Sequence, residues 1–239
     1  MQRRASARAA RRSSFRAVLP ALAVTLCTVL LPSLTPARAA DVEVRVQDPA
    51  AKGVPGIVVI AEPDRPTHDR SAVRTAVMDQ IHMQFVPNIL VIQTGSAVDF
   101  PNSDQIRHQV YSFSAAKKFE LSLYEGHQYP PVLFDRAGLV TVGCNIHDNM
   151  IGYIYVTDSP FFGRTDAAGR VVLHGLPAGD YTLTLWHPGM HEPGGKTLHA
   201  KLTLAAGGAR AQQLFKLTRP LLPDMNATGD MGSMRWAQD

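Results

Sequence analysis

The sequence predicts an all-β protein made of two β-sandwiches, and two features of its 239 residues indicate this class. No long stretch carries apolar residues at helical spacing, whereas short segments of alternating apolar and polar residues recur throughout. The 18 glycines and 17 prolines are spread along the chain. They divide it into strand-sized pieces about every 8–12 residues, as in sandwiches and barrels.

The expected strands fall into three groups along the chain. The first group is residues 42–46 and 57–61, joined by a turn at 48–53 and followed by a polar connector at 62–74. The second group begins near Val77, with strands expected at 83–87, 89–92, 97–100, 110–113, 139–143 and 151–156. The third group follows Ser159, with turns at 165–170 and 176–181 and strands expected at 171–173, 181–186, 198–204 and 213–217.

The first forty residues read as a signal peptide. They hold seven arginines and no acidic residue, around an apolar run at 17–34, and Ala37-Arg38-Ala39 is an Ala-x-Ala cleavage signal. We therefore expect cleavage near Ala39 and a periplasmic protein with no membrane span after cleavage. Arg11-Arg12 leaves the twin-arginine route open beside the general export route.

Removing the leader changes the charge and the cysteine count. Of 24 lysines and arginines, 17 remain after the leader against 20 acidic residues, which is a net charge of −3. This balance does not favour a nucleic-acid binder, which would show clustered basic residues. Cys27 leaves with the leader, so Cys144 is the one remaining thiol and no internal disulfide is expected.

The string Cys144-Asn-Ile-His147-Asp-Asn-Met150 and the upstream His108 suggest a metal site. One thiolate, two imidazoles and a thioether are the ligand set of a blue-copper centre, with the methionine as a weak axial ligand. Structural zinc would need a fourth strong ligand. The candidate metal ligands are therefore His108, Cys144, His147 and Met150, with His127 as the rival histidine.

The middle group resembles the cupredoxins, the plastocyanin and amicyanin family. The resemblance rests on the ligand loop and on three further segments: Phe85-Val86-Pro87, Gly95 with Val98-Asp99-Phe100, and Asn102 six residues before His108. The whole chain is similar to exported bacterial proteins of the methylamine-utilisation or plastocyanin-like type. This resemblance implies a Greek-key β-sandwich, one type 1 copper ion, and electron transfer with redox partners such as a c-type cytochrome or a dehydrogenase.

The third group resembles the transthyretin-like domain found beside carboxypeptidases. The matching turns are Thr165-Asp166-x-x-Gly169 and Leu176-Pro177-x-Gly179-x-Tyr181, and Gly53-Val54-Pro55-Gly56 matches the domain's opening. This implies that the cupredoxin block is inserted between the second and third strands of the smaller sandwich. The alternative is that residues 42–61 add strands to the cupredoxin. The expected divisions are a signal peptide at 1–40, a transthyretin-like sandwich at 41–65 and 159–218, a cupredoxin domain at 71–158 and a mobile tail at 219–239.

The chain departs from the family at three positions around the ligands. Gln109 stands where plastocyanin and amicyanin have asparagine, and Ile146 and Asp148 stand where amicyanin has prolines. Hydrogen bonding to the ligand sulfur, which tunes redox potential, is therefore left open. Asn102 is expected either to hold the first ligand loop by side-chain hydrogen bonds or to be an ordinary turn residue.

These features predict a periplasmic blue-copper protein that carries single electrons. The alternative is copper binding for delivery, storage or sensing without electron transfer. We do not expect an enzyme, because copper oxidases and nitrite reductases need further His-x-His or His-Cys-His strings and the sequence has none. Adhesion or sugar binding by the smaller sandwich would rest on fold resemblance alone.

Overall fold

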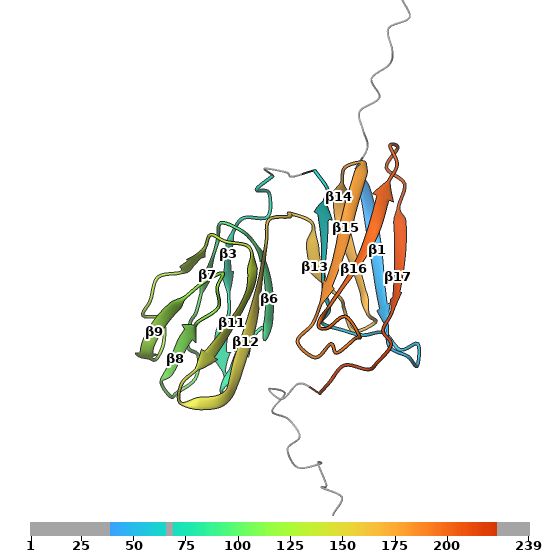
Figure 1. Cartoon of the computed structure of the whole chain (residues 1–239). Coiled ribbons are helices and arrows are strands. Elements are labelled where there is room, and N and C mark those ends of the chain that lie inside the picture. Colours follow the sequence, from blue (N-terminus) through green and yellow to red (C-terminus); the bar gives the residue numbers. More distant parts are fainter. Residues whose placement is uncertain (1–38, 66–68, 224–239) are drawn as a thin grey trace, which may run out of the picture. The chain divides into compact units, whose positions relative to one another are not determined.

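The computed structural model describes residues 39–65 and 69–223, and in these residues every regular element is a β-strand (Figure 1). This confirms the all-β prediction. Most of the expected signal peptide and most of the expected C-terminal tail lie outside the described residues, as does Cys27. Among the described residues, no helix is long and apolar enough to cross a membrane.

The first and last strands of the described chain form one sandwich of two sheets. One sheet has the order β14-β1-β17 and the other β13-β2-β15-β16. Their bounds are β1 Ala40–Gln47, β2 Val58–Pro63, β13 Phe162–Arg164, β14 Arg170–Leu176, β15 Gly179–Trp186, β16 Thr197–Leu204 and β17 Ala211–Lys216. Strand β1 pairs with β14 and β17, and β2 pairs with β13 and β15. Residues 40–63 therefore pair with the C-terminal strands rather than with the block between them.

Two turns of this sandwich pack backbone against backbone. The carbonyl oxygen of Ala168 would lie only 2.2 Å from a Cβ atom added at Gly53, and Gly169 has a left-handed φ of 72°. The side chain of Thr165 joins the same turns, because its hydroxyl accepts a hydrogen bond from the N–H of Ile57 and donates one to the carbonyl of Val54. The glycine-rich turns that stand out in the sequence are thus in direct contact, where only a residue without Cβ fits.

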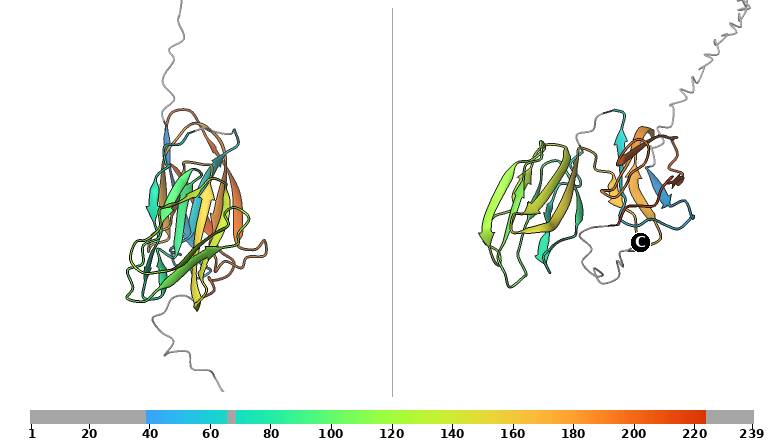
Figure 2. Two further views of the ribbon diagram at one scale, coloured as in Figure 1. Left: turned by 90° about the vertical axis from the view of Figure 1, so that its left-hand side faces the viewer. Right: turned by 60° about the horizontal axis from the view of Figure 1, so that its bottom comes forward.

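The strands between β2 and β13 form the second sandwich, shown from two further sides in Figure 2. Its sheets have the orders β10-β7-β3 and β6-β12-β11-β8-β9, with the hairpin β4-β5 beside them. Their bounds are β3 Thr75–Val77, β4 Asp79–Ile81, β5 Gln84–Val86, β6 Ile89–Gln93, β7 Ser96–Asp99, β8 His108–Ser112, β9 Phe119–Tyr124, β10 Val132–Phe134, β11 Gly138–Cys144 and β12 His147–Thr157.

Several strands of this sandwich were not expected from the sequence. They are β3, β4, β9 and β10, and β13 of the other sandwich was also missed. Strand β9 follows Lys117-Lys118, and in it only Leu121 and Tyr124 are buried. Four of these five strands have three residues, too few to show the alternation that identifies a strand in a sequence.

Each sandwich has its own buried core. The core of the smaller sandwich is built on Val42, Val44 and Val46 of β1 together with apolar residues of β2, β14, β15 and β16. The core of the larger sandwich includes Cys144 and Met150. A third, smaller apolar cluster contains residues of β2, β6 and β15, in which the indole of Trp186 packs edge-on against the ring of Tyr153 with centroids 5.6 Å apart.

Gly152 on β12 offers a test of the packing that supports the larger sandwich. A Cβ atom at Gly152 would lie 2.9 Å from the Cβ of Phe85 and 3.0 Å from a methyl of Val142. Gly152→Ala therefore overpacks the core, and we expect it to lower the free energy of unfolding by about 1–3 kcal/mol. The measurement is the urea midpoint, with Gly194→Ala as the control because a Cβ there meets no atom within 4 Å. Equal midpoints for the two variants would contradict the packing described.

Candidate metal centre

Three of the four predicted ligands come together in the structure. One ligand atom each from His108, Cys144 and His147 lies within 4.8 Å of the other two. The sulfur of Cys144 is 3.9 Å from Nδ1 of His108 and 3.7 Å from Nδ1 of His147. Both imidazoles thus present the same ring nitrogen to one sulfur.

Neighbouring strands bring these side chains together. His108 begins β8, Cys144 ends β11 and His147 begins β12, and β11 is hydrogen-bonded to both β8 and β12 (Figure 1). Along β11, Val140, Val142 and Cys144 are buried and the residues between them are more exposed, so alternation turns the thiol toward the core. Cys144 is paired with His147 across the turn between β11 and β12, at a shift in the strand register. A short loop and strand alternation together place the thiol opposite the imidazole.

The distances fit one metal ion among three ligands. Bonds of about 2.0–2.1 Å to nitrogen and about 2.3 Å to sulfur, set ~120° apart, separate the sulfur from each nitrogen by about 3.8 Å. The two observed separations, 3.9 and 3.7 Å, lie on either side of that value. A thiolate with two imidazoles is a soft donor set that suits copper and does not suit magnesium or calcium.

The three ligands differ in exposure. His108 and Cys144 are buried, and His147 is partly exposed. The two imidazole rings lie edge to face, with centroids 4.9 Å apart. Within this cluster, His147 is therefore the residue that solvent reaches.

Met150 lies in the same buried core cluster as Cys144. It follows His147 by three residues on β12, where Met150, Gly152 and Ile154 are all buried. The methionine is thus on the core side of the strand that carries one of the histidine ligands. The rival histidine, His127, does not join the cluster; one of its ring nitrogens lies 2.7 Å from the carboxylate of Asp99.

The backbone supplies a hydrogen bond to the ligand sulfur. The N–H of Gln109 donates to Sγ of Cys144 at 3.5 Å, while the side chain of Gln109 donates to Glu120 at 2.7 Å. The contact that the sequence left open is therefore made by the main chain. The side chain of Gln109 takes no part in this contact.

Asn102 holds the loop that leads to His108. Its Nδ2 donates to the carbonyls of Ile106 and Tyr124, each at 2.8 Å, and its Oδ1 accepts from the N–H of Asp104 at 3.0 Å. Asn102 is buried. Of the two roles expected for it, the structure shows the one in which it ties the ligand loop together.

Asp104 is a residue near the centre that the sequence analysis did not single out. Its Oδ2 lies 2.8 Å from Nε2 of His108, on the side of the ring away from Cys144. Burial raises the pKa of this carboxyl, but hydrogen bonds from the N–H of Met83, the ring of His108 and the N–H of His82 outweigh it and hold the pKa below its usual value. The signal for it was an aspartate four residues before a candidate ligand, which alone is too common to be decisive.

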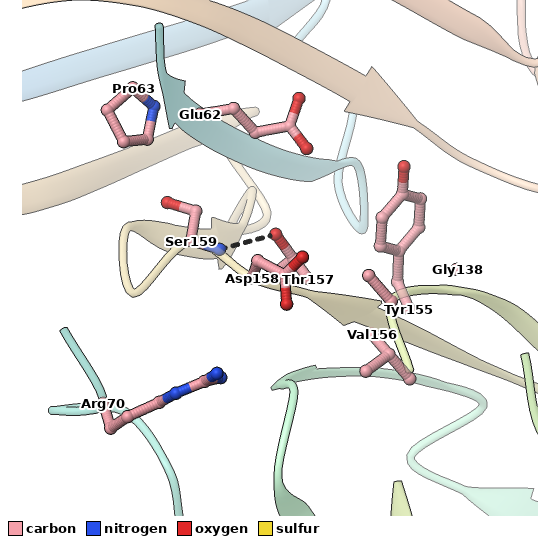
Figure 3. Close-up of a pocket in the computed structure, with 10 residues that line it drawn as sticks. Glu62, Pro63, Arg70, Gly138, Tyr155, Val156, Thr157, Asp158 and Ser159 are labelled. Carbon is pink, nitrogen blue, oxygen red and sulfur yellow. Dashed lines mark hydrogen bonds between the residues drawn. The ribbon is translucent and has the colours of Figure 1, made fainter. Parts of the chain in front are cut away.

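The structure also has a pocket away from the ligand cluster, and residues at the end of β2 and at the end of β12 line it (Figure 3). Its charged lining residues are Glu62, Arg70 and Asp158, and Tyr155 beside them has a raised pKa because of burial and the nearby Glu62. None of the ligand residues lines it. A metal held by converging side chains does not need such a hollow, so the pocket does not bear on the metal centre.

No family model matches the chain, and no curated protein matches it. Among solved structures, it is similar to the copper-containing nitrite reductase of Thermus scotoductus SA-01, with 22% identity and a TM-score of 0.33. That match covers 34% of the chain and 22% of the reductase, so the chain spans about a fifth of the reductase.

Two further proteins are similar over almost their whole length. A reduced amicyanin variant is 19% identical with a TM-score of 0.31, over 40% of the chain and 97% of the amicyanin. A purple cupredoxin from Nitrosopumilus maritimus is 18% identical with a TM-score of 0.31, over 35% of the chain and 99% of that protein. The case for a metal centre rests on the chain's own side chains.

Asn102→Ala tests the support of the ligand loop. The substitution leaves the carbonyls of Ile106 and Tyr124 and the N–H of Asp104 without the partner they have in the structure. We expect the free energy of unfolding to fall by about 1–3 kcal/mol, the cost of unsatisfied buried polar groups. Urea unfolding of the metal-free protein measures this, and Ser122→Ala, on the exposed side of β9, is the control. An unchanged midpoint for Asn102→Ala would contradict the role.

Proposed function

We propose that this chain is a periplasmic type 1 copper protein that carries single electrons between redox partners. The observation that supports it best is the convergence of two Nδ1 atoms on the sulfur of Cys144, at 3.9 and 3.7 Å. The thiolate and the two imidazoles at these separations would hold one copper ion, and Met150 would add a weak fourth donor. The arginine-rich leader supports export.

Different residues of the chain would have different roles in electron transfer. Copper in such a site supplies a one-electron couple, Cu(II)/Cu(I), which takes an electron from a reduced donor and passes it to an oxidised acceptor. Cys144, His108 and His147 would hold the ion, and the strands that carry them would keep the ligands in one arrangement in both states. The partly exposed His147 would bring the site within reach of a partner.

The surface around the site has the character of a weak redox interface. Apolar side chains next to the ligands are exposed: Ile146 at 50% and Ile106 at 45%. Met83, whose N–H bonds to Asp104, is 49% exposed. Asp148 beside His147 is also exposed and adds a negative charge. Small interfaces suit short-lived redox encounters, and we propose a c-type cytochrome or a dehydrogenase as the partner.

The visible spectrum of the copper-loaded mature protein tests the proposal. A copper–thiolate site gives an intense orange-red absorption, and we expect Cys144→Ser to abolish it and Met150→Leu to alter it weakly, because a thioether would be only a weak donor. His127→Ala is the matched control, since His127 belongs to the same sandwich but lies outside the cluster. A wild-type protein that binds copper tightly without this absorption would favour copper delivery, storage or sensing instead.

Charge reversal at Asp148 tests the docking surface. If the partner presents a basic face, Asp148→Lys slows association at low salt by up to about tenfold, and the difference shrinks as salt screens the charges. Stopped-flow electron transfer to a basic c-type cytochrome measures the rate. Asp135→Lys is the control. Asp135 is also exposed, but it lies shortly before the first residue of β11, whereas Cys144 is the last residue of that strand. Equal rates for the wild type and Asp148→Lys at every salt concentration would rule out this surface.

A further inference from the structure

The carboxylate of Asp104 accepts three hydrogen bonds around the ligand His108. Its Oδ1 accepts from the N–H of His82 at 2.6 Å. Its Oδ2 accepts from the N–H of Met83 at 2.8 Å and lies 2.8 Å from Nε2 of His108. Three groups from two separate segments thus meet at one side chain.

The identity of these groups determines where the protons are. Backbone N–H groups can only donate, so both oxygens of Asp104 act as acceptors, which is the role of an ionised carboxylate. An accepting oxygen beside Nε2 requires Nε2 to carry the hydrogen. In a neutral imidazole the other nitrogen, Nδ1, then has the free lone pair, and this is the nitrogen that faces Cys144.

His82 and Met83 are held in an unusual backbone conformation at this point. Their φ values are 54° and 57°, in the left-handed region that residues with a Cβ rarely adopt. The two hydrogen bonds to Asp104 offset the cost of this turn between β4 and β5. These two N–H groups also keep the Asp104 carboxylate in place, so the position of the carboxylate does not depend on His108 alone.

We propose that Asp104 is a positioning residue that holds His108 in its metal-binding tautomer and, through its negative charge, favours Cu(II) over Cu(I). This inference rests on the proposed copper function. A carboxylate bonded to the far nitrogen makes an imidazole ligand more basic, and a more basic ligand stabilises the higher charge of the metal. His108 is buried, so water screens this effect little. The result is a lower reduction potential than the same ligands would give without Asp104.

Two substitutions separate the charge from the hydrogen bond. Asp104→Asn keeps an acceptor oxygen and removes the charge, while Asp104→Ala removes both. For Asp104→Asn we expect Cu(II) affinity to fall about 10–100-fold, the usual effect of losing such a partner, with a smaller loss of Cu(I) affinity and therefore a higher reduction potential. Asp104→Ala should also lose the preference for the Nε2–H tautomer, which ¹⁵N NMR of the metal-free protein reads directly.

Asp99→Asn is the matched control. Asp99 pairs with His127 at 2.7 Å in the same sandwich, so the control removes an aspartate–histidine contact and one negative charge away from the ligands. It should leave the tautomer of His108 and the ratio of Cu(II) to Cu(I) affinity unchanged. If the Asp104→Asn variant does not fold, Asp104→Asn and Asp99→Asn are compared in a protein that also carries Met83→Gly. Glycine adopts the left-handed φ of position 83 without cost, so the turn then depends less on Asp104.

The outcomes distinguish this inference from the proposed function. The role of Asp104 would be overturned if both Asp104 variants kept the wild-type tautomer of His108 and the wild-type ratio of Cu(II) to Cu(I) affinity. If the copper–thiolate absorption were present at the same time, the proposed copper function would still stand. Absence of that absorption in the wild type would overturn the copper function. The NMR measurement on metal-free protein would still show whether Asp104 sets the tautomer of His108.

Discussion

The contact between the Cys144 sulfur and two imidazole nitrogens depends on the pairing of β11 with the strands on both sides of it. Strand β8 brings His108 from one side, and β12 brings His147 from the other. Because successive side chains of a strand point to opposite faces, a shift of one residue in β11 would turn the thiol away from both histidines. The ligand cluster is therefore a consequence of strand register.

The two histidines are alike in sequence and different in the structure. His108 is buried and bonded to Asp104, whereas His147 is partly exposed at the start of β12 and is flanked by the exposed residues Ile146 and Asp148. In the proposed electron carrier, the buried ligand with its fixed partner would set the properties of the metal. The partly exposed ligand would connect the metal to the surface, so two different side chains would serve these two functions.

The strands that hold the ligands all lie between β2 and β13 in the chain, and the strands outside this block form their own sandwich with its own core. Close contact between the turns at Gly53 and Gly169 joins the segments before and after the block. A long segment between two strands is tolerated when the surrounding strands bury a core of their own. The sequence of the ligand loop can therefore vary without disturbing the core of the smaller sandwich, whose strands precede and follow this block in the chain.

The sequence by itself determined the strand-rich class and the ligand loop, because both are local patterns. The offsets of Cys144, His147 and Met150 lie within one short loop and the strand after it, and the alternation in β11 and β12 is visible in the residues themselves. Four three-residue strands, β3, β4, β10 and β13, were not predicted, since they are too short to show a period.

The tertiary structure alone decided how distant segments meet. Which nitrogen of His108 faces the sulfur, which turn Asp104 contacts and which strands pair with β1 are all set by contacts between residues far apart in the chain. Such contacts depend on register and packing across the whole sandwich, and no local pattern in the sequence records them.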